Sequence, residues 1–166
     1  MNIRRLFTSL LAVALLSGST GLLTSNAADA PKTPRKEIYD AKADGAKQIA
    51  AALAAAKADK KHVILQFGAN WCGWCHRLHK LFESDKDIAD KLKSDYVVVL
   101  VDVDKGHNES IDKQYGNPIR FGLPVMVVLD AEGKQLTTKN TSELEVGDHH
   151  DPAKVMAFLK EWAPKR

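Results

Sequence analysis

A run of five aliphatic residues at positions 97–101 constrains the fold more than any other feature of the sequence. Four of the five are valine, whose branched side chain favours β-strands over helices. The run contains no polar residue, and a strand without polar alternation is expected to be covered on both faces. The sequence therefore predicts a buried strand at 96–103, within a sheet that has helices on each side.

Helical and strand patterns alternate along the rest of the chain. Apolar residues at three- and four-residue spacing predict helices, and short apolar runs bounded by turn residues predict strands. The expected helices span 41–60, 73–93 with a candidate break at Ser84-Asp85, 108–115 and a last segment capped by Asp151-Pro152; the other strands span 62–67, 125–129 and 135–138. This order predicts an α/β fold with a central mixed sheet of about four to five strands, flanked by helices and closed by a hairpin at 131–134.

Residues 1–27 have the pattern of a secretory signal peptide. Arg4 and Arg5 give a short positive start, residues 6–16 form a mostly apolar run, and Ala27 ends a small-residue cleavage sequence. The apolar run is shorter than the ~20 residues of a spanning helix, so we expect cleavage and no stable membrane span. The expected organisation is a signal peptide at 1–27, an extended lead-in at 28–40 and one domain at 41–166, in a periplasmic or secreted protein.

Composition excludes several classes of function. The chain has 166 residues, which suits a single domain, and 45% of them are hydrophobic, which is enough for a core. Its 24 basic and 21 acidic residues give a net charge of +3 without a basic run, so no nucleic acid partner is expected. Two cysteines are too few for a multi-disulfide scaffold and form either one bridge or a reactive pair.

The two cysteines stand in the sequence Trp71-Cys72-Gly73-Trp74-Cys75-His76, between a predicted strand and the first turn of a predicted helix. Cysteines three residues apart at a helix start can close a small disulfide. The unpaired backbone N–H groups and the helix dipole favour an anion at the first cysteine, so its thiol pKa is expected to fall below the free value of ~8.5. Cys72 is therefore the candidate nucleophile, and Cys75 the candidate residue that resolves a mixed disulfide.

The order of these features resembles the thioredoxin-like superfamily over about residues 41–163. An apolar strand precedes Trp71-Cys72, the strand at 99–104 ends in acidic residues, Gly122-Leu123-Pro124 precedes the strand at 125–129, and a turn follows at 130–133. The resemblance implies that Pro124 is cis and lies against the cysteine pair. It also implies that Leu123 offers its backbone to an extended substrate, as in strand addition.

The chain looks most like small exported thioredoxin-like proteins related to the reducing end of periplasmic disulfide pathways. The resemblance implies a thiol:disulfide oxidoreductase that exchanges disulfides with exported proteins, more in the reducing direction, with an upstream redox partner. Trp71, Gly73 and Trp74 are expected to form one side of the substrate surface, and Leu123 and Pro124 the other. We expect a monomer that needs no cofactor and no metal.

The chain departs from the family at Gln66. Thioredoxins usually carry a buried acid on the strand before the motif, and a glutamine cannot exchange a proton with the resolving thiol. His76 is a candidate substitute because it follows Cys75 directly, although its side chain is expected along the helix flank.

Three other interpretations of the motif remain open. The letters from Cys72 to His76 also fit the c-type haem attachment pattern, for which Met126 is a possible second ligand. Cys72, Cys75, His76 and His79 are residue types that bind zinc or copper, although four ligands so close in one helix do not easily converge. The pair is also compatible with an inert structural disulfide, which would have to be buried, whereas the flanking tryptophans indicate an exposed patch.

The remaining polar and aromatic features have simpler interpretations. His149-His150, between Asp148 and Asp151, is expected to be a solvated lead-in to the last helix. Asp102 and Asp104 are expected to serve the turn after their strand, and Trp162 is expected in the core or as a cap against the sheet.

Overall fold

The computed structural model describes residues 35–165, and all structural statements below concern that part of the chain. The predicted signal peptide at 1–27 and the first residues of the predicted lead-in lie outside the described residues. The helices are α1 (Gly45–Asp59), α2 (Gly73–Ser84), α3 (Lys86–Asp95), α4 (Glu109–Gln114) and α5 (Pro152–Glu161), and the strands are β1 (His62–Gly68), β2 (Tyr96–Asp102), β3 (Val125–Leu129), β4 (Gln135–Asn140), β5 (Glu145–Val146) and β6 (His149–His150).

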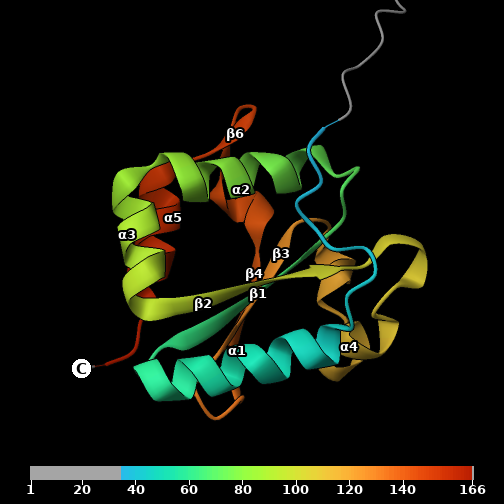
Figure 1. The fold of residues 1–166 in the computed structure, drawn as a ribbon. Coiled ribbons are helices and arrows are strands. Elements are labelled where there is room, and N and C mark those ends of the chain that lie inside the picture. The colour runs from blue at the N-terminus through green and yellow to red at the C-terminus, as the bar shows by residue number, and fades with distance from the viewer. Residues whose placement is uncertain (1–34, 166) are drawn as a thin grey trace, which may run out of the picture. The chain divides into compact units, whose positions relative to one another are not determined.

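Four strands form one mixed sheet in the order β2-β1-β3-β4 (Figure 1). β1 runs parallel to β2 and antiparallel to β3, and β4 closes the sheet as an antiparallel hairpin with β3. The predicted α/β fold with a mixed sheet flanked by helices is confirmed. β5 and β6 form a separate two-stranded ladder before α5.

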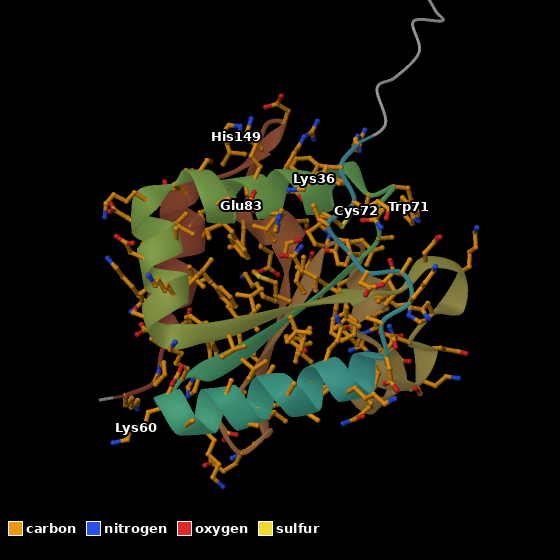
Figure 2. All side chains as sticks on the ribbon, in the orientation of Figure 1. Lys36, Lys60, Trp71, Cys72, Glu83 and His149 are labelled. Atoms are coloured by element: carbon orange, nitrogen blue, oxygen red, sulfur yellow. A yellow bond between two sulfur atoms is a disulfide. The ribbon has the colours of Figure 1, made fainter. Side chains whose placement is uncertain are left out.

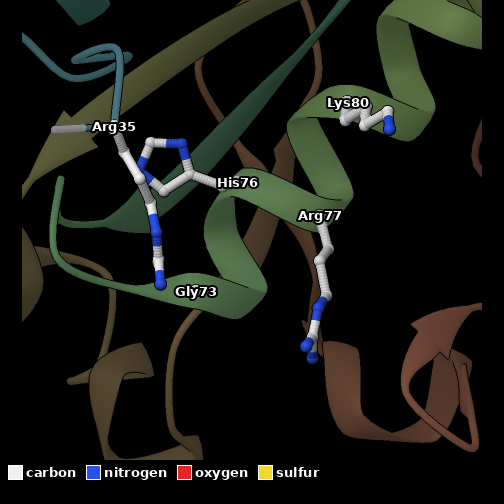
Figure 3. Close-up of a pocket in the computed structure, with 5 residues that line it drawn as sticks. All are labelled: Arg35, Gly73, His76, Arg77 and Lys80. Atoms are coloured by element: carbon white, nitrogen blue, oxygen red, sulfur yellow. The ribbon is translucent and has the colours of Figure 1, made fainter. Parts of the chain in front are cut away.

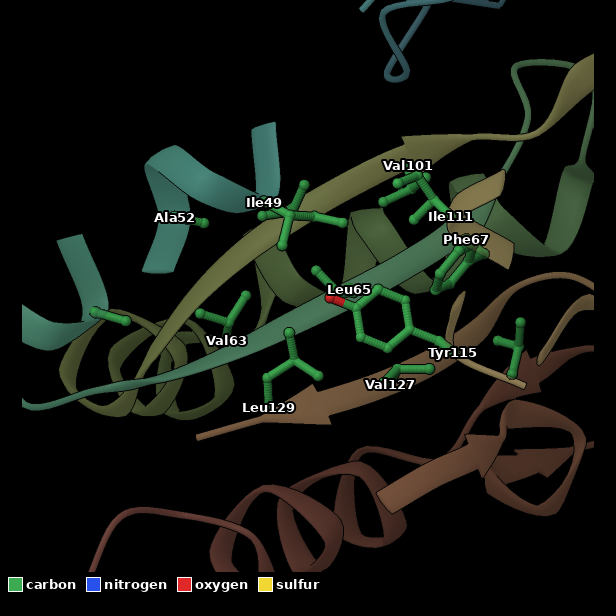
Figure 4. Close-up of a cluster of buried hydrophobic side chains, with 13 residues drawn as sticks. Ile49, Ala52, Val63, Leu65, Phe67, Val101, Ile111, Tyr115, Val127 and Leu129 are labelled. Carbon is green, nitrogen blue, oxygen red and sulfur yellow. The ribbon is translucent and has the colours of Figure 1, made fainter. Parts of the chain in front are cut away.

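Helices cover both faces of the four-stranded sheet. On one face, residues of α1 and α4 pack against alternate residues of the strands, as Figure 4 shows for Ile49, Ile111, Leu65 and Val127. On the other face, α2, α3 and α5 form the second core; its largest members include Ile64, Leu78, Phe82, Met126, Phe158 and Leu159. No helix within residues 35–165 is long and apolar enough to span a membrane.

Side-chain caps set the helix boundaries. Asp85 ends α2 and begins α3, because its carboxylate accepts the backbone N–H of Ile88 at 3.0 Å. This confirms the predicted break at Ser84-Asp85. Asp151 caps α5 in the same way, accepting the N–H groups of Ala153 and Lys154, which confirms the predicted cap.

The prediction that both faces of the 96–103 strand are covered is wrong. β2 is an edge strand of the sheet, and the Val98 side chain is 37% exposed. The fully enclosed strand is β1, in which every residue from Val63 to Gly68 is buried. An apolar run indicates burial, but the order of strands in the sheet is a tertiary property that the run does not encode.

Candidate active site

The two cysteines lie where β1 passes into α2 and are joined by a disulfide. Cys72 is the N-cap of α2, and its Sγ accepts the backbone N–H of Cys75 at 3.1 Å. A thiolate formed at Cys72 on reduction would be stabilised by this N–H group and by the positive end of the helix dipole. The local geometry therefore favours an ionised sulfur at position 72 over position 75.

The disulfide is less exposed than the sequence suggested. Trp71 is 66% exposed beside it (Figure 2), but Cys72 is only 4% exposed and Cys75 is fully buried. The exposed patch predicted from the tryptophans therefore includes Trp71 and not the sulfur atoms. Cys72 and Cys75 form a buried cluster with Tyr39, and the partly buried side chains of Ile38, Trp74, Leu100 and Leu123 pack against this cluster.

Tyr39 lies beneath the disulfide, and Gly68 makes room for it. A Cβ atom at Gly68 would lie 2.2 Å from the Tyr39 hydroxyl oxygen and 2.7 Å from Cys75 Sγ. Such distances are far inside van der Waals contact, so only glycine fits where the tyrosine hydroxyl and the buried sulfur meet. Tyr39 itself is 2% exposed, and burial raises the pKa of its hydroxyl well above the ordinary value.

Gln66, the departure from the family pattern, is fully buried and donates an Nε2 hydrogen bond to the Tyr39 hydroxyl at 2.7 Å. Because the tyrosine oxygen accepts this bond, its own O–H remains available as a donor near Cys75. Sequence reasoning missed Tyr39, which falls in the predicted lead-in. The only signal was an Ile38-Tyr39 pair within an otherwise charged segment.

Asn70 fixes the segment that carries Tyr39. Its Oδ1 accepts the backbone N–H groups of Ile38 and Tyr39, both at 2.9 Å, and its Nδ2 donates to the Tyr39 carbonyl at 2.9 Å. The described residues from Arg35 onward belong to one compact unit, and these bonds tie Ile38 and Tyr39 of the predicted lead-in to it. Part of the predicted lead-in is therefore part of the domain and of the site.

His76 does not substitute for the missing acid. Its Nε2 lies 2.7 Å from the Asn70 carbonyl oxygen. A carbonyl only accepts, so Nε2 carries the proton and donates it to the backbone instead of facing Cys75. The side chain lies along the flank of α2, as the sequence indicated.

The acidic residues after β2 reach the exposed tryptophan. Asp102 Oδ1 accepts the backbone N–H of Asp104 at 3.1 Å, which confirms that the pair serves the turn. Asp104 also accepts the indole N–H of Trp71 at 2.8 Å and so restrains that ring, a role the sequence did not indicate. Asp102 is 2% exposed, and its Oδ2 has no hydrogen-bond partner within residues 35–165.

Trp74 is held between the side chains of Arg77 and His150. The Arg77 guanidinium lies 4.6 Å from the Trp74 ring centroid, and the His150 ring meets it edge-on at 5.3 Å. The prediction of a solvated His149-His150 lead-in is wrong for His150, which is 3% exposed, whereas His149 is exposed. Burial, with smaller contributions from Arg77 and His149, lowers the pKa of His150 to about 4.

The loop before β3 lies against the disulfide. The Leu123–Pro124 peptide bond is cis, which confirms what the resemblance implied. Leu123 packs against the cluster of Tyr39, Cys72 and Cys75, and the Pro124 carbonyl accepts a hydrogen bond from the Thr141 hydroxyl.

The residues of the haem and metal interpretations do not converge. Within the described chain, no group of three His, Cys, Asp or Glu side chains is arranged to hold a metal ion. His76 is bound to the Asn70 carbonyl, and His79 Nε2 lies 3.3 Å from a Glu83 oxygen. Met126 is fully buried in the core between the sheet and α2, where no haem face is open to it.

The mixed sheet, the disulfide at the start of α2 and the cis-proline loop against it together define the class of thioredoxin-fold thiol:disulfide oxidoreductases. The family model described as thioredoxin-like matches residues 44–131, and the chain belongs to that family.

Known proteins that are similar to this chain in sequence or structure are named for disulfide isomerisation or thiol:disulfide interchange. A crystal structure described as disulphide isomerase from Xylella fastidiosa Temecula1 superposes with a TM-score of 0.66 at 30% identity, covering 76% of this chain and 96% of that one. The thiol:disulfide interchange protein DsbD of Vibrio vulnificus is 29% identical over 106 residues, and that of Klebsiella pneumoniae 31% over 110 residues. These matches cover 64% and 66% of this chain but only 18% and 17% of the relatives.

Proposed function

We propose that this chain is an exported thiol:disulfide oxidoreductase that exchanges disulfides with other exported proteins, more in the reducing direction. The observation that carries the proposal is the hydrogen bond from the Cys75 backbone N–H to Cys72 Sγ at the start of α2. This bond stabilises a thiolate at Cys72 and so makes that sulfur the nucleophile. Cys75, fully buried one turn further along, is the resolving residue.

In the proposed reaction, two electrons and two protons pass from the reduced cysteine pair to the partner disulfide. The Cys72 thiolate attacks one sulfur of a partner disulfide, forms a mixed disulfide and releases the other partner sulfur as a thiolate, which takes up a proton. Cys75 then loses its proton and attacks Cys72 Sγ, which releases the second partner thiol and leaves the Cys72–Cys75 disulfide. An upstream dithiol protein restores the reduced pair by the same exchange in reverse.

The surfaces beside the cysteines are proposed to bind the partner. Exposed Trp71, with Gly73 and Trp74, forms one side, and Leu123 with Pro124 forms the other. The position of Leu123 against the cysteine cluster supports an extended partner segment along its backbone. Because Cys72 is 4% exposed, the partner has to displace part of the side chains that cover it before the sulfur can react.

Tyr39 is proposed to act at Cys75 in place of the family's acid. Its high pKa keeps the hydroxyl neutral, so at Cys75 it can serve as a hydrogen-bond donor and not as an acceptor of the thiol proton. A donor beside Cys75 stabilises the thiolate that attacks Cys72. Gln66 orients the hydroxyl through its Nε2 bond.

Export to the periplasm or the exterior is proposed from the sequence of residues 1–27. The exported domain is proposed to be a monomer. The relatives named thiol:disulfide interchange proteins support exchange with other thiol proteins and an upstream redox partner. The reducing direction is proposed from the resemblance to exported reducing proteins.

Trapping of mixed disulfides tests the proposed roles of the two cysteines. The mature protein carrying Cys75→Ser should form a covalent adduct with a disulfide-bonded test protein, seen as a mobility shift on a non-reducing gel and reversed by dithiothreitol. The matched Cys72→Ser variant should form none, because Cys75 is fully buried. Adducts formed equally by both variants would contradict the assignment of Cys72 as the nucleophile.

A further inference from the structure

A pocket of about 250 Å³ lies beside the start of α2 (Figure 3), and neither the chemistry of exchange nor the apolar surfaces account for it. Its lining residues are Arg35, Gly73, His76, Arg77 and Lys80. All of its charged groups are positive. In the described chain, no carboxylate lies within 4.0 Å of the charged atoms of these two arginines or of Lys80, although several other lysines are ion-paired.

Contacts hold part of this positive pocket in place. Arg35 is exposed and not restrained in this way, but its guanidinium lies close to the helix start, with Nη1 3.3 Å from the place of a Cβ atom at Gly73. Arg77 is restrained by stacking on Trp74 at 4.6 Å, and His76 by its bond to the Asn70 carbonyl. Restrained cations lose less conformational entropy when they bind an anion than free surface lysines do.

The pocket adjoins the nucleophile. Gly73 follows Cys72 directly, and His76 and Lys80 lie one and two turns further along the same helix. At 1.5 Å per residue, the pocket extends from Cys72 over about 12 Å of α2. An extended peptide advances ~3.3 Å per residue, so a group two to four residues from the reacting cysteine reaches the pocket.

We propose that this pocket binds a carboxylate side chain of the partner protein, located two to four residues from the partner's reacting cysteine. The inference rests on the proposed function and adds a specificity for acidic segments to it. A volume of about 250 Å³ is below the ~300–1,000 Å³ of small-molecule sites and suits a single side chain. Arginine guanidinium groups bind carboxylates with two parallel hydrogen bonds, which suits this anion.

Two disulfide-linked peptide dimers test the proposal, one with Glu and one with Gln three residues after the cysteine. The reduced mature protein should react with the Glu peptide about five-fold faster at low ionic strength, as followed by tryptophan fluorescence, and 0.5 M NaCl should reduce the difference. The Arg35→Gln/Lys80→Gln variant should lose the preference. The control Lys47→Gln/Lys113→Gln removes two exposed positive charges from α1 and α4 and should keep it.

Equal rates with the two peptides, or a preference that survives Arg35→Gln/Lys80→Gln, would overturn the proposal. A faster reaction with oxidised glutathione than with the Glu peptide would overturn the assignment to a protein segment. A Glu peptide with serine in place of cysteine separates binding from exchange. If neither dimer is exchanged, but this peptide shifts the Gly73 and His76 amide resonances in the wild type and not in the double variant, the pocket stands and the proposed function fails.

Discussion

Replacing Gly68 by alanine tests the close approach of Tyr39 and Cys75 on which the candidate site depends. The added methyl group would lie 2.2 Å from the Tyr39 hydroxyl oxygen and 2.7 Å from Cys75 Sγ, so both neighbours have to move. Overpacking of a core costs roughly 1–3 kcal/mol. Displacing Tyr39 also breaks its bond from buried Gln66, for about 1 kcal/mol more. We therefore expect a loss of about 2–4 kcal/mol in the free energy of unfolding.

Urea unfolding of the oxidised protein, followed by circular dichroism, measures this loss. Gly73→Ala is the matched control, because its methyl group would meet only the flexible end of Arg35 at 3.3 Å. This control should not lower the free energy of unfolding, since alanine is the better helix former. A Gly68→Ala protein within about 0.5 kcal/mol of the wild type would refute the packing described for Tyr39 and Cys75.

Three further changes probe the surroundings of the disulfide. Tyr39→Phe leaves the buried Gln66 amide without its acceptor and should cost about 1–3 kcal/mol of stability. It should also slow the release of the mixed disulfide. An unchanged urea midpoint would argue against the role of Tyr39 in stability, and an unchanged release rate against its role at Cys75. His150 has a pKa lowered from 6.5 to about 4, so its contribution to stability is complete above pH 6.5 and is lost as pH falls toward 4. The urea midpoint should fall over that range, and less so in His150→Leu; equal slopes would contradict burial of a neutral histidine. Asp104→Asn weakens the acceptor of the Trp71 indole N–H and should increase the mobility of that ring, measured as lower fluorescence anisotropy, whereas the control Asp148→Asn should not.

Local signals in the sequence were sufficient for most of the fold. Asp85 and Asp151 are capping residues at their predicted positions, and they set helix boundaries by hydrogen bonds within three residues. The edge position of β2 was not predictable, because an apolar run such as the one around Val98 is equally typical of a strand in the centre of a sheet. Its 37% exposure follows from the strand order, which depends on contacts between distant segments.

The same distinction applies to the site. Cys72 and Cys75 stand in a short pattern that predicts a disulfide, and the resemblance to the thioredoxin-like superfamily implied the cis bond at Pro124. The role of Tyr39 was not predictable, because its partner Gln66 lies 27 residues away in the sequence and Tyr39 itself stands in a segment rich in charges. His150 was not predictable for the same reason, since the Trp74 ring that covers it lies far away in the sequence.

The reduction potential of the Cys72–Cys75 pair tests the central claim most directly. The mature protein is equilibrated in graded thiol/disulfide buffers and followed by tryptophan fluorescence, since Trp71 and Trp74 flank the pair. A protein with both cysteines changed to serine is the control and should show no transition. The account predicts one two-electron transition near the ~ −270 mV of thioredoxin, whereas no transition, or one near ~ −120 mV, would contradict a reducing thiol:disulfide oxidoreductase.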